Sequence, residues 1–174
     1  MLRGEKVNLR TVRSRDLETY LELSSEIGTR GEYYPLQLPT ETSLRARFEK
    51  DGFWGEDTGL LLIVDRQSDR ILGMIVYFKP VHYYDGFEIG YILFNPTDRG
   101  KGYMTEALRL FCRYLFDLKP IHRLQVQVQR ENAGSRKVAE KCGFQFEGTS
   151  RSAFVSHGQP VDIDVFSLLR GELR

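Results

Sequence analysis

A strand-like segment passes into a helix-like one across the glycine-rich turn in Asn95-Pro96-Thr97-Asp98-Arg99-Gly100-Lys101-Gly102-Tyr103-Met104-Thr105-Glu106-Ala107. Residues 87–94 upstream predict a strand, and downstream an apolar stripe predicts an amphipathic helix: Met104, Ala107, Leu108, Phe111 and Leu115. Glycines at 100 and 102 let the backbone approach a ligand closely, and the unpaired N–H groups of the first helical turn favour an anion. The stretch therefore predicts a main-chain site for a phosphate-bearing ligand. The alternative is a capping turn that holds no ligand, which is the commoner reason for a lone Gly-x-Gly.

Two better-known nucleotide signatures do not fit this turn. A dinucleotide fingerprint needs a third glycine where the chain has Thr105. A P-loop needs Ser or Thr directly after its lysine, whereas Lys101 is followed by Gly102. We therefore expect neither NAD nor ATP to bind here.

Length and composition are typical of one globular domain, which we assign to residues 1–174. The chain has 25 Lys+Arg against 24 Asp+Glu, so its net charge of +1 gives no general attraction to nucleic acid or to an anionic membrane. Cys112 and Cys142 lack the spacing of a metal or redox motif and are expected to be reduced packing residues. No signal peptide or membrane span is visible in the sequence, so we expect a cytoplasmic protein without a membrane partner.

Hydrophobic periodicity predicts a mixed α/β chain, an α+β sheet flanked by helices. The predicted strands are residues 7–12, 60–64, 71–78, 87–94, 122–129, 144–154 and 161–169. Ser14 is expected to cap a helix that ends near Gly28, and a short helix is expected at residues 44–48.

A second motif follows the strand at residues 122–129, and it reads Asn132-Ala133-Gly134-Ser135 and then Gly143-Phe144-Gln145-Phe146-Glu147-Gly148. The order strand, Arg-Gly-x-Gly turn, helix, strand, Asn-x-x-Ser, helix, Gly-Phe-x-x-Glu-Gly resembles the GNAT acyl-CoA N-acyltransferases, and among them the RimJ/RimL-like branch. The resemblance covers nearly the whole chain and implies a single GNAT-like domain with a mixed, mostly antiparallel sheet. Met104 departs from the superfamily pattern of glycine or alanine, although bulkier residues occur in RimL-like members.

The resemblance implies acetyl-CoA as co-substrate and N-acetyl transfer to a primary amine by direct attack in a ternary complex. Its cofactor-binding positions fall on the following residues: Ile92, Leu93, Phe94, Arg99, Gly100, Lys101, Gly102, Tyr103, Met104, Thr105, Asn132 and Ser135. A main-chain N–H between Ile92 and Phe94 would polarise the thioester carbonyl, like an oxyanion hole. Asn132 would bind the pantetheine arm and Ser135 would protonate the departing thiolate; alternatively, both residues simply cap the following helix.

Glu88 is the candidate general base, because its strand leads directly into the glycine turn and its apolar neighbours can raise its pKa. The alternative is an ordinary strand glutamate that faces solvent or an arginine. Deprotonation at pH 7 costs about 1 kcal/mol for an α-amine and about 4–5 kcal/mol for a lysine-like amine, so a base is most useful for the latter. RimL-like enzymes are thought to use a further carboxylate on the strand after Glu-Gly, but here that strand reads Arg151-Ser152-Ala153-Phe154. Without an acid there, a ribosomal-protein substrate is in doubt.

The acceptor is expected to be a protein N-terminal α-amine or a small-molecule amine. Tyr33, Tyr34 and Trp54 are candidates for an aromatic wall around it, with core or lid packing as the alternative. The three histidines are scattered without ligand spacing, so no metal is expected. One rival hypothesis is a non-catalytic CoA-binding sensor or scaffold. Another is a nucleic-acid binder, which is not our expectation and which would use the basic residues near the second motif: Arg123, Arg130, Arg136, Lys137 and Lys141. Homodimerisation stays open.

Overall fold

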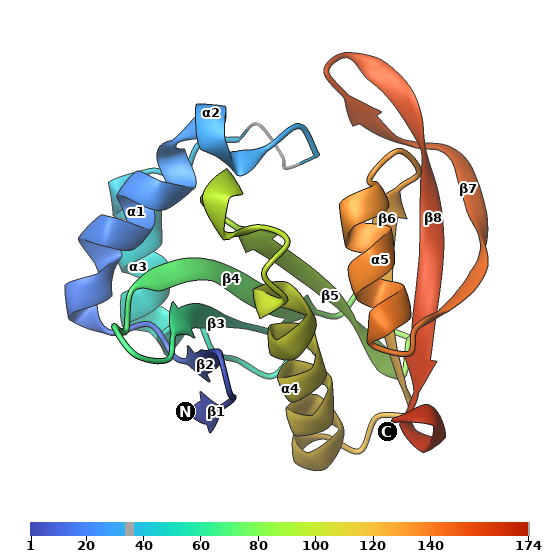
Figure 1. Ribbon diagram of the computed structural model, residues 1–174, viewed down its shortest axis with the longest axis horizontal. Helices are drawn as coiled ribbons and strands as arrows, with labels where there is room; N and C mark the ends of the chain where they lie inside the picture. Colours follow the sequence, from blue (N-terminus) through green and yellow to red (C-terminus); the bar gives the residue numbers. More distant parts are fainter. Residues whose placement is uncertain (34–36, 174) are drawn as a thin grey trace.

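The structure, a computed structural model, describes residues 1–33 and 37–173. Within these residues, eight strands form one sheet in the order β1-β2-β3-β4-β5-β6-β8-β7 (Figure 1). The strands are β1 (Leu2–Arg3), β2 (Val7–Arg10), β3 (Thr58–Asp65), β4 (Ile71–Phe78), β5 (Gly86–Leu93), β6 (Arg123–Gln129), β7 (Gln145–Ser156) and β8 (Gln159–Leu169). The α-helices are α1 (Leu17–Ser25), α2 (Ile27–Arg30), α3 (Glu41–Asp51), α4 (Tyr103–Leu118) and α5 (Ala133–Lys141).

The centre of the sheet holds a parallel contact between β5 and β6, whereas the other neighbouring strands described here run antiparallel. The parallel pairing covers only residues 86–88 of β5 against residues 123–125 of β6. Beyond that point the two strands are no longer paired. The predicted mixed, mostly antiparallel α+β sheet flanked by helices is therefore confirmed, and the sheet opens along the second half of β5.

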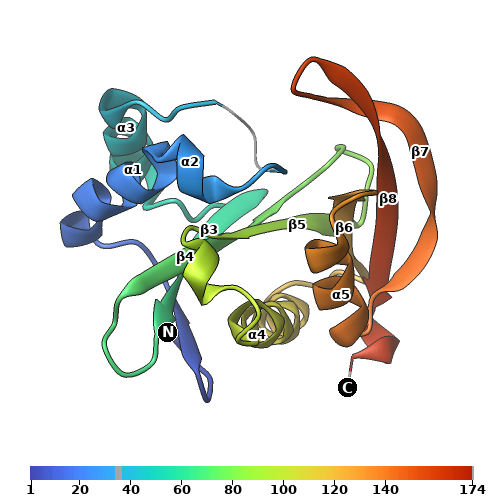
Figure 2. The ribbon, with the colours of Figure 1, turned by 45° about the horizontal axis from the view of Figure 1, so that its top comes forward.

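Helices cover both faces of the sheet, and the alternation of side chains along β3 shows this directly. Leu61 and Ile63 pack in one cluster with α4, whereas Leu60 and Leu62 pack in a second cluster with α1 and α3. Figure 2 shows α4 and the pair α1 and α3 on opposite sides of the strands. The predicted stripe of α4 is buried throughout: Met104, Ala107, Leu108, Phe111 and Leu115. Over the two described ranges, no helix has the length and hydropathy needed to cross a bilayer.

The N-terminal region differs from the prediction in its first strand and in the start of its first helix, and that helix ends at Ser25, before a separate α2. The expected strand over residues 7–12 ends early, and a short strand, β1, precedes it and pairs back on it. Ser14 does not cap α1, because a 3₁₀ helix (Ser14–Asp16) comes first. Within it the carboxylate of Asp16 accepts the N–H of Arg13 at 2.7 Å. Asp16 therefore stands at the N-cap position of α1, and its carboxylate binds backbone before the 3₁₀ helix instead of α1 itself.

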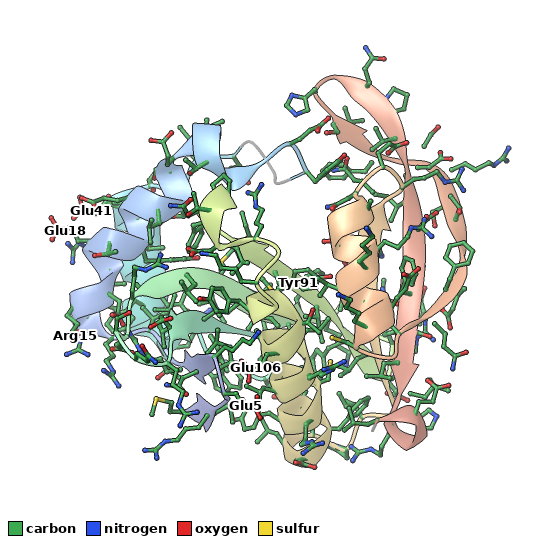
Figure 3. All side chains as sticks on the ribbon, in the orientation of Figure 1. Glu5, Arg15, Glu18, Glu41, Tyr91 and Glu106 are labelled. Atoms are coloured by element: carbon green, nitrogen blue, oxygen red, sulfur yellow. The ribbon has the colours of Figure 1, made fainter. Side chains whose placement is uncertain are left out.

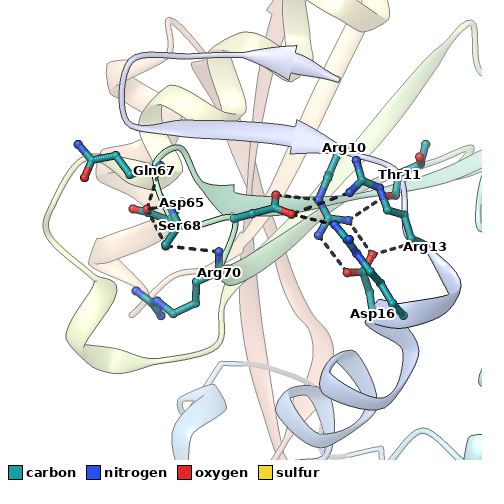
Figure 4. A network of polar contacts seen from close by, with 10 residues as sticks. Arg10, Thr11, Arg13, Asp16, Asp65, Gln67, Ser68 and Arg70 are labelled. Carbon is teal, nitrogen blue, oxygen red and sulfur yellow. Dashed lines mark hydrogen bonds and ion pairs between the residues drawn. The ribbon is translucent and has the colours of Figure 1, made fainter.

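A buried ion pair between β2 and this 3₁₀ helix holds that aspartate (Figure 4). Arg10 donates to the two carboxylate oxygens of Asp16 at 2.6 Å and 3.0 Å, and its Nε donates to Asp69 at 3.1 Å. Arg10 is 3% exposed and Asp16 is 6% exposed. Burial raises the pKa of Asp16, but the hydrogen bonds from Arg10 and from the N–H of Arg13 outweigh it and keep the pKa below its ordinary value.

Candidate active site

The glycine turn after β5 has the backbone that its sequence predicts. Gly100 and Gly102 have φ angles of +78° and +84°, in the left-handed region that other residues rarely adopt. A Cβ built at Gly100 would meet no heavy atom within 4 Å. The turn passes directly into α4 at Tyr103. A ligand can therefore approach the main chain closely at the start of this helix.

Side chains of neighbouring elements hold the turn in place. Asp98 is 2% exposed and accepts hydrogen bonds from both Nη groups of Arg70 at 2.9 Å and 3.0 Å, which lowers the pKa of Asp98. The Nζ of Lys101 lies 3.7 Å from the same carboxylate. The guanidinium of Arg99 donates to the carbonyl of Thr29 at 2.9 Å and ties the turn to α2. The side chains of Arg99 and Lys101, both expected to bind the cofactor, thus already have partners within the protein.

The acidic side chain in the first turn of α4, that of Glu106, is bound to the β1–β2 turn. The N–H of Glu106 donates to the carbonyl of Gly102 at 3.1 Å, so the N–H groups of residues 103–105 precede the first intrahelical bond. The carboxylate of Glu106 accepts three N–H groups at 2.5, 2.9 and 3.0 Å, and Figure 3 shows it beside the β1–β2 turn that supplies them: Glu5, Lys6 and Val7. The start of α4 therefore keeps its attraction for an anion.

A cleft of ≈ 450 Å³ opens where β5 and β6 diverge. Four residues proposed from the sequence line it: Tyr33, Glu88, Asn132 and Ser135. Much of the remaining lining is apolar and comes from β4, β6 and the β7–β8 hairpin: Met74, Val76, Phe78, Val126, Phe154 and Ile163. The structure thus brings the middle of β5, the start of α5 and the hairpin together around Glu88.

Glu88 is half-buried in this cleft and has two hydrogen-bond donors on β6. Gln125 and Gln127 each donate from Nε2 to the same oxygen, Oε2, at 2.9 Å. Burial raises the pKa of Glu88, and the two hydrogen bonds oppose that rise without cancelling it. A carboxylate with a raised pKa is suited to accept a proton from an ammonium group.

The start of α5 lies in the same cleft. Asn132 caps the helix, since its Oδ1 accepts the N–H of Ser135 at 3.0 Å, so the capping alternative is observed. Both residues nevertheless line the cleft. Tyr91 lies between α4 and α5 in Figure 3, and its hydroxyl donates to the carbonyl of Ser135 at 3.3 Å. Burial raises the pKa of Tyr91. The hydroxyl groups of Ser135 and Tyr91 are therefore both candidates to supply a proton.

At the end of β5, the main-chain N–H groups proposed from the sequence point in different directions. The N–H of Phe94 already donates to the carbonyl of Leu72 at 3.0 Å. Because successive N–H groups of a strand point to opposite sides, the N–H of Leu93 faces away from β4, toward the side where β6 has diverged. Gly73 allows the close approach of β4, since a Cβ there would lie 2.0 Å from the carbonyl oxygen of Ile92. Leu93 is thus the candidate for the carbonyl-polarising N–H.

The aromatic wall proposed from the sequence needs correction. Trp54 lies away from the cleft: its ring packs on Tyr77 with centroids 5.3 Å apart, and it lines a separate cavity of ≈ 130 Å³. It is a packing residue, which was the alternative. Tyr34 lies outside the described residues. Tyr33 lines the cleft and donates its hydroxyl to the carbonyl of Glu131 at 3.2 Å.

β7 runs past the cleft at the strand where the resemblance places a second carboxylate. Ala153 and Phe154 line the cleft there. The register of β7 against β8 shifts between Ser150 and Phe154, and Ser152 has a φ of +50°, so the strand bulges. This stretch presents a methyl group and an aromatic ring to the cleft in place of an acid.

Three of the arginines proposed for nucleic-acid binding form ion pairs with acids on β7 and β8: Arg123 with Glu147, Arg130 with Asp162, and Arg136 with Asp164. Cations engaged in this way are poorly available to a phosphate backbone, which disfavours the nucleic-acid hypothesis. Among residues 1–33 and 37–173, no group of three or more His, Cys, Asp or Glu side chains is placed to hold a metal ion.

Known proteins are similar to this chain in sequence and in fold. Residues 6–145 match the acetyltransferase (GNAT) domain. The chain is 32% identical to the probable N-acetyltransferase YjcK of Bacillus subtilis (strain 168), over 97% of each sequence. A GNAT-family acetyltransferase from Bacillus anthracis has the same fold, with a TM-score of 0.81 and 26% identity over 98% of this chain and 99% of the other.

A spermidine N-acetyltransferase from Vibrio cholerae, solved in complex with CoA and spermine, also shares the fold. Its TM-score is 0.83 at 19% identity, over 98% of this chain and 99% of the other. The family match spans most of the chain and includes both the glycine turn and the Asn-x-x-Ser motif. The chain therefore belongs to the acetyltransferase (GNAT) family and is an acyl-CoA N-acyltransferase.

Proposed function

We propose that this enzyme transfers the acetyl group of acetyl-CoA to a primary amine that binds in the cleft beside Glu88, by direct attack in a ternary complex. The observation that carries the proposal is the position of Glu88. It is a half-buried carboxylate with a raised pKa, located where β5 and β6 diverge, on the strand that leads into the glycine turn. The paired Arg-Gly-x-Gly and Asn-x-x-Ser motifs support a place in the RimJ/RimL-like branch.

The glycine turn and the start of α4 fit the phosphates of CoA. Gly100 leaves the backbone open, Gly102 has the same left-handed backbone, and the N–H groups of residues 103–105 lie at the positive end of the helix dipole. Asn132 and Ser135 lie in the cleft, where the pantetheine arm would run. Acetyl-CoA supplies the acyl group as an activated thioester.

Three groups of the chain then act on the protons and charge of the reaction. Glu88 takes a proton from the incoming ammonium, directly or through water, and leaves a neutral amine as nucleophile. The N–H of Leu93 stabilises the negative charge that develops on the carbonyl oxygen. The hydroxyl of Ser135, or that of Tyr91 beside it, protonates the departing thiolate, and the second proton lost by the amine nitrogen as the amide forms restores that hydroxyl.

The lining of the cleft favours an amine that carries one positive charge on an apolar body. Among the described residues that line it, Glu88 is the one with a charged side chain, and Met74, Val76, Phe78 and Phe154 offer apolar surface. A polyamine or an aminoglycoside would bring several cations to a single carboxylate and leave desolvated charges unpaired. A peptide N-terminus with an apolar first residue, or a small monoamine, fits this lining better.

Thiol release from acetyl-CoA tests this proposal across apolar monoamines, N-terminal peptides, spermidine and an aminoglycoside. We expect an apolar monoamine or peptide to give a kcat/KM at least about tenfold above that of the polycations. A free-energy cost of about 1.4 kcal/mol for leaving a charge unpaired is enough for that ratio. A preference for spermidine would overturn the acceptor assignment. CoA binding without thiol release on any acceptor would overturn the enzymatic proposal in favour of the sensor module.

Replacing Gly100 with alanine is expected to weaken CoA binding. A left-handed backbone costs an alanine about 1–2 kcal/mol, so the turn will relax and the Kd for CoA will rise about 5–30-fold. Gly158→Ala is a matched control, because Gly158 has a φ of +76° and equally open surroundings but lies in the β7–β8 turn. Calorimetry will compare the variants, and native CoA affinity in Gly100→Ala would contradict the role of this turn.

A further inference from the structure

Gln125 is a buried polar side chain whose two ends have different partners. It is 7% exposed, its Nε2 donates to Glu88 at 2.9 Å, and its Oε1 accepts the hydroxyl of Tyr84 at 2.7 Å. One end of an amide donates and the other accepts, so the partner at one end decides what the other end offers. Glu88 therefore receives a donor from Gln125 while Tyr84 donates to the opposite end.

Arg123 decides the direction of the Tyr84 hydroxyl. Its Nε donates to the Tyr84 oxygen, and its Nη groups bind both carboxylate oxygens of Glu147, one of them at 2.6 Å. Arginine cannot accept a hydrogen bond, so the single hydroxyl proton of Tyr84 is left for Gln125. Ser167 donates to Glu147 at 2.7 Å and anchors the far end of the chain of hydrogen bonds.

We propose that Tyr84 is a positioning residue that, through Gln125, keeps a hydrogen-bond donor directed at the carboxylate of Glu88. The role of that carboxylate as base rests on the proposed function, whereas the chain of hydrogen bonds does not. Without the Tyr84 hydroxyl, the Oε1 of Gln125 loses its donor and the amide is free to rotate. Rotation presents a carbonyl oxygen to Glu88, which disfavours the charged carboxylate and favours its protonated form.

Three neutral residues lie beside Glu88, Phe78 on β4 and Gln125 and Gln127 on β6, and two tyrosines, Tyr33 and Tyr91, line other parts of the cleft. Burial raises the pKa of both tyrosines, so they stay uncharged over the range in which a carboxyl titrates. Arg123 and Glu147 neutralise each other at the far end of the chain. The titration of Glu88 is therefore a sensitive measure of the donors supplied by β6.

The experiment is a titration of the Glu88 carboxyl by carbon-detected NMR of protein labelled with ¹³C-glutamate, in the absence of substrate. Tyr84→Phe is expected to raise the midpoint by about one pH unit, the scale of one hydrogen bond to a charged group. Tyr83→Phe is the matched control, because Tyr83 is adjacent in sequence but 76% exposed, and it should leave the midpoint unchanged. The Glu88→Gln protein identifies the resonance by its loss.

Arg123→Lys tests the chain of hydrogen bonds from its other end, because lysine keeps the charge but lacks the Nε that donates to Tyr84. It should raise the Glu88 midpoint in the same direction, and it decides the matter if Tyr84→Phe does not fold. An unchanged midpoint in the folded variants, or an equal shift in Tyr83→Phe, would overturn the proposal. If Glu88→Gln keeps full activity, the base assignment fails, while the titration still decides whether Tyr84 positions the carboxylate.

Discussion

With a small alkylamine of lysine-like pKa as acceptor, replacing Glu88 with glutamine is expected to lower kcat by about 10²–10⁴-fold, the usual contribution of a positioned general base. Glutamine has nearly the size of glutamate and can still face Gln125 and Gln127, so the cleft should keep its shape. It cannot take a proton from the incoming ammonium. The Kd for CoA should stay unchanged, because other residues form the glycine turn. Steady-state kinetics and calorimetry measure the two effects separately.

The pH profile of kcat/KM provides an independent check on this assignment. Because burial raises the pKa of Glu88, native activity should fall as the pH drops through a value above that of an exposed glutamate. In Glu88→Gln, the fall in kcat/KM that is due to protonation of Glu88 should disappear. The dependence of kcat/KM on the protonation of the amine acceptor should remain. Glu140→Gln, at an exposed position of α5, is the matched control and should retain the native profile. A native kcat in Glu88→Gln would show that another group acts as base.

Replacing Asp16 with asparagine is expected to lower the free energy of unfolding by about 3–5 kcal/mol, the usual loss when one partner of a buried ion pair is removed. The guanidinium of Arg10 would stay buried at 3% exposure without the buried carboxylate of Asp16 and would keep the half-exposed carboxylate of Asp69 as its acidic partner. The N–H of Arg13 would also exchange a charged acceptor for the neutral amide oxygen of asparagine. Denaturation by urea, followed by circular dichroism, measures the difference.

Asp69→Asn is the matched control, because it removes the other carboxylate that binds Arg10. The side chain of Asp69 is 46% exposed, so its loss should cost less than about 1 kcal/mol. The pKa of Asp16 is lowered in the fold, so its contribution is complete above the unfolded-state pKa and is lost as the pH falls through the folded-state pKa. Native stability should therefore decline more steeply in this acidic range than that of Asp16→Asn. Equal losses in the two variants would contradict the role of the buried pair.

The fold was predictable where it depends on short-range patterns. Gly100 and Gly102 predict a left-handed turn, and the apolar stripe that follows predicts the buried face of α4. Both patterns involve residues that are close together in the sequence. Ser14 shows where such reasoning ends. It was chosen as a cap from its residue type, but Asp16 stands at the N-cap position of α1, and its carboxylate is held by Arg10, on a separate strand.

The candidate site was predictable in its central carboxylate and not in the residues that act on it. Glu88 stood out because its strand leads into the glycine turn, whereas Gln125 and Gln127 reach it only because β5 and β6 lie in parallel register. The alternation of glutamines with aliphatic residues along β6 was the available signal, and it indicates a polar face without naming its neighbour. The assignment of Trp54 to the acceptor site was wrong for the same reason. Its aromatic character does not indicate which face of the sheet it packs against.

β7 is one of the two edge strands of the sheet and, at 12 residues, the longest of the described strands, with Phe146 exposed on it. A long outer strand normally offers its free N–H and C=O groups to another molecule, and aggregation can start there. The register of β7 shifts between Phe146 and Gly148 and again between Ser150 and Phe154, which divides that free row into short runs. We therefore expect the irregularity that brings Ala153 and Phe154 to the cleft also to oppose continuous edge-to-edge pairing between copies of the enzyme.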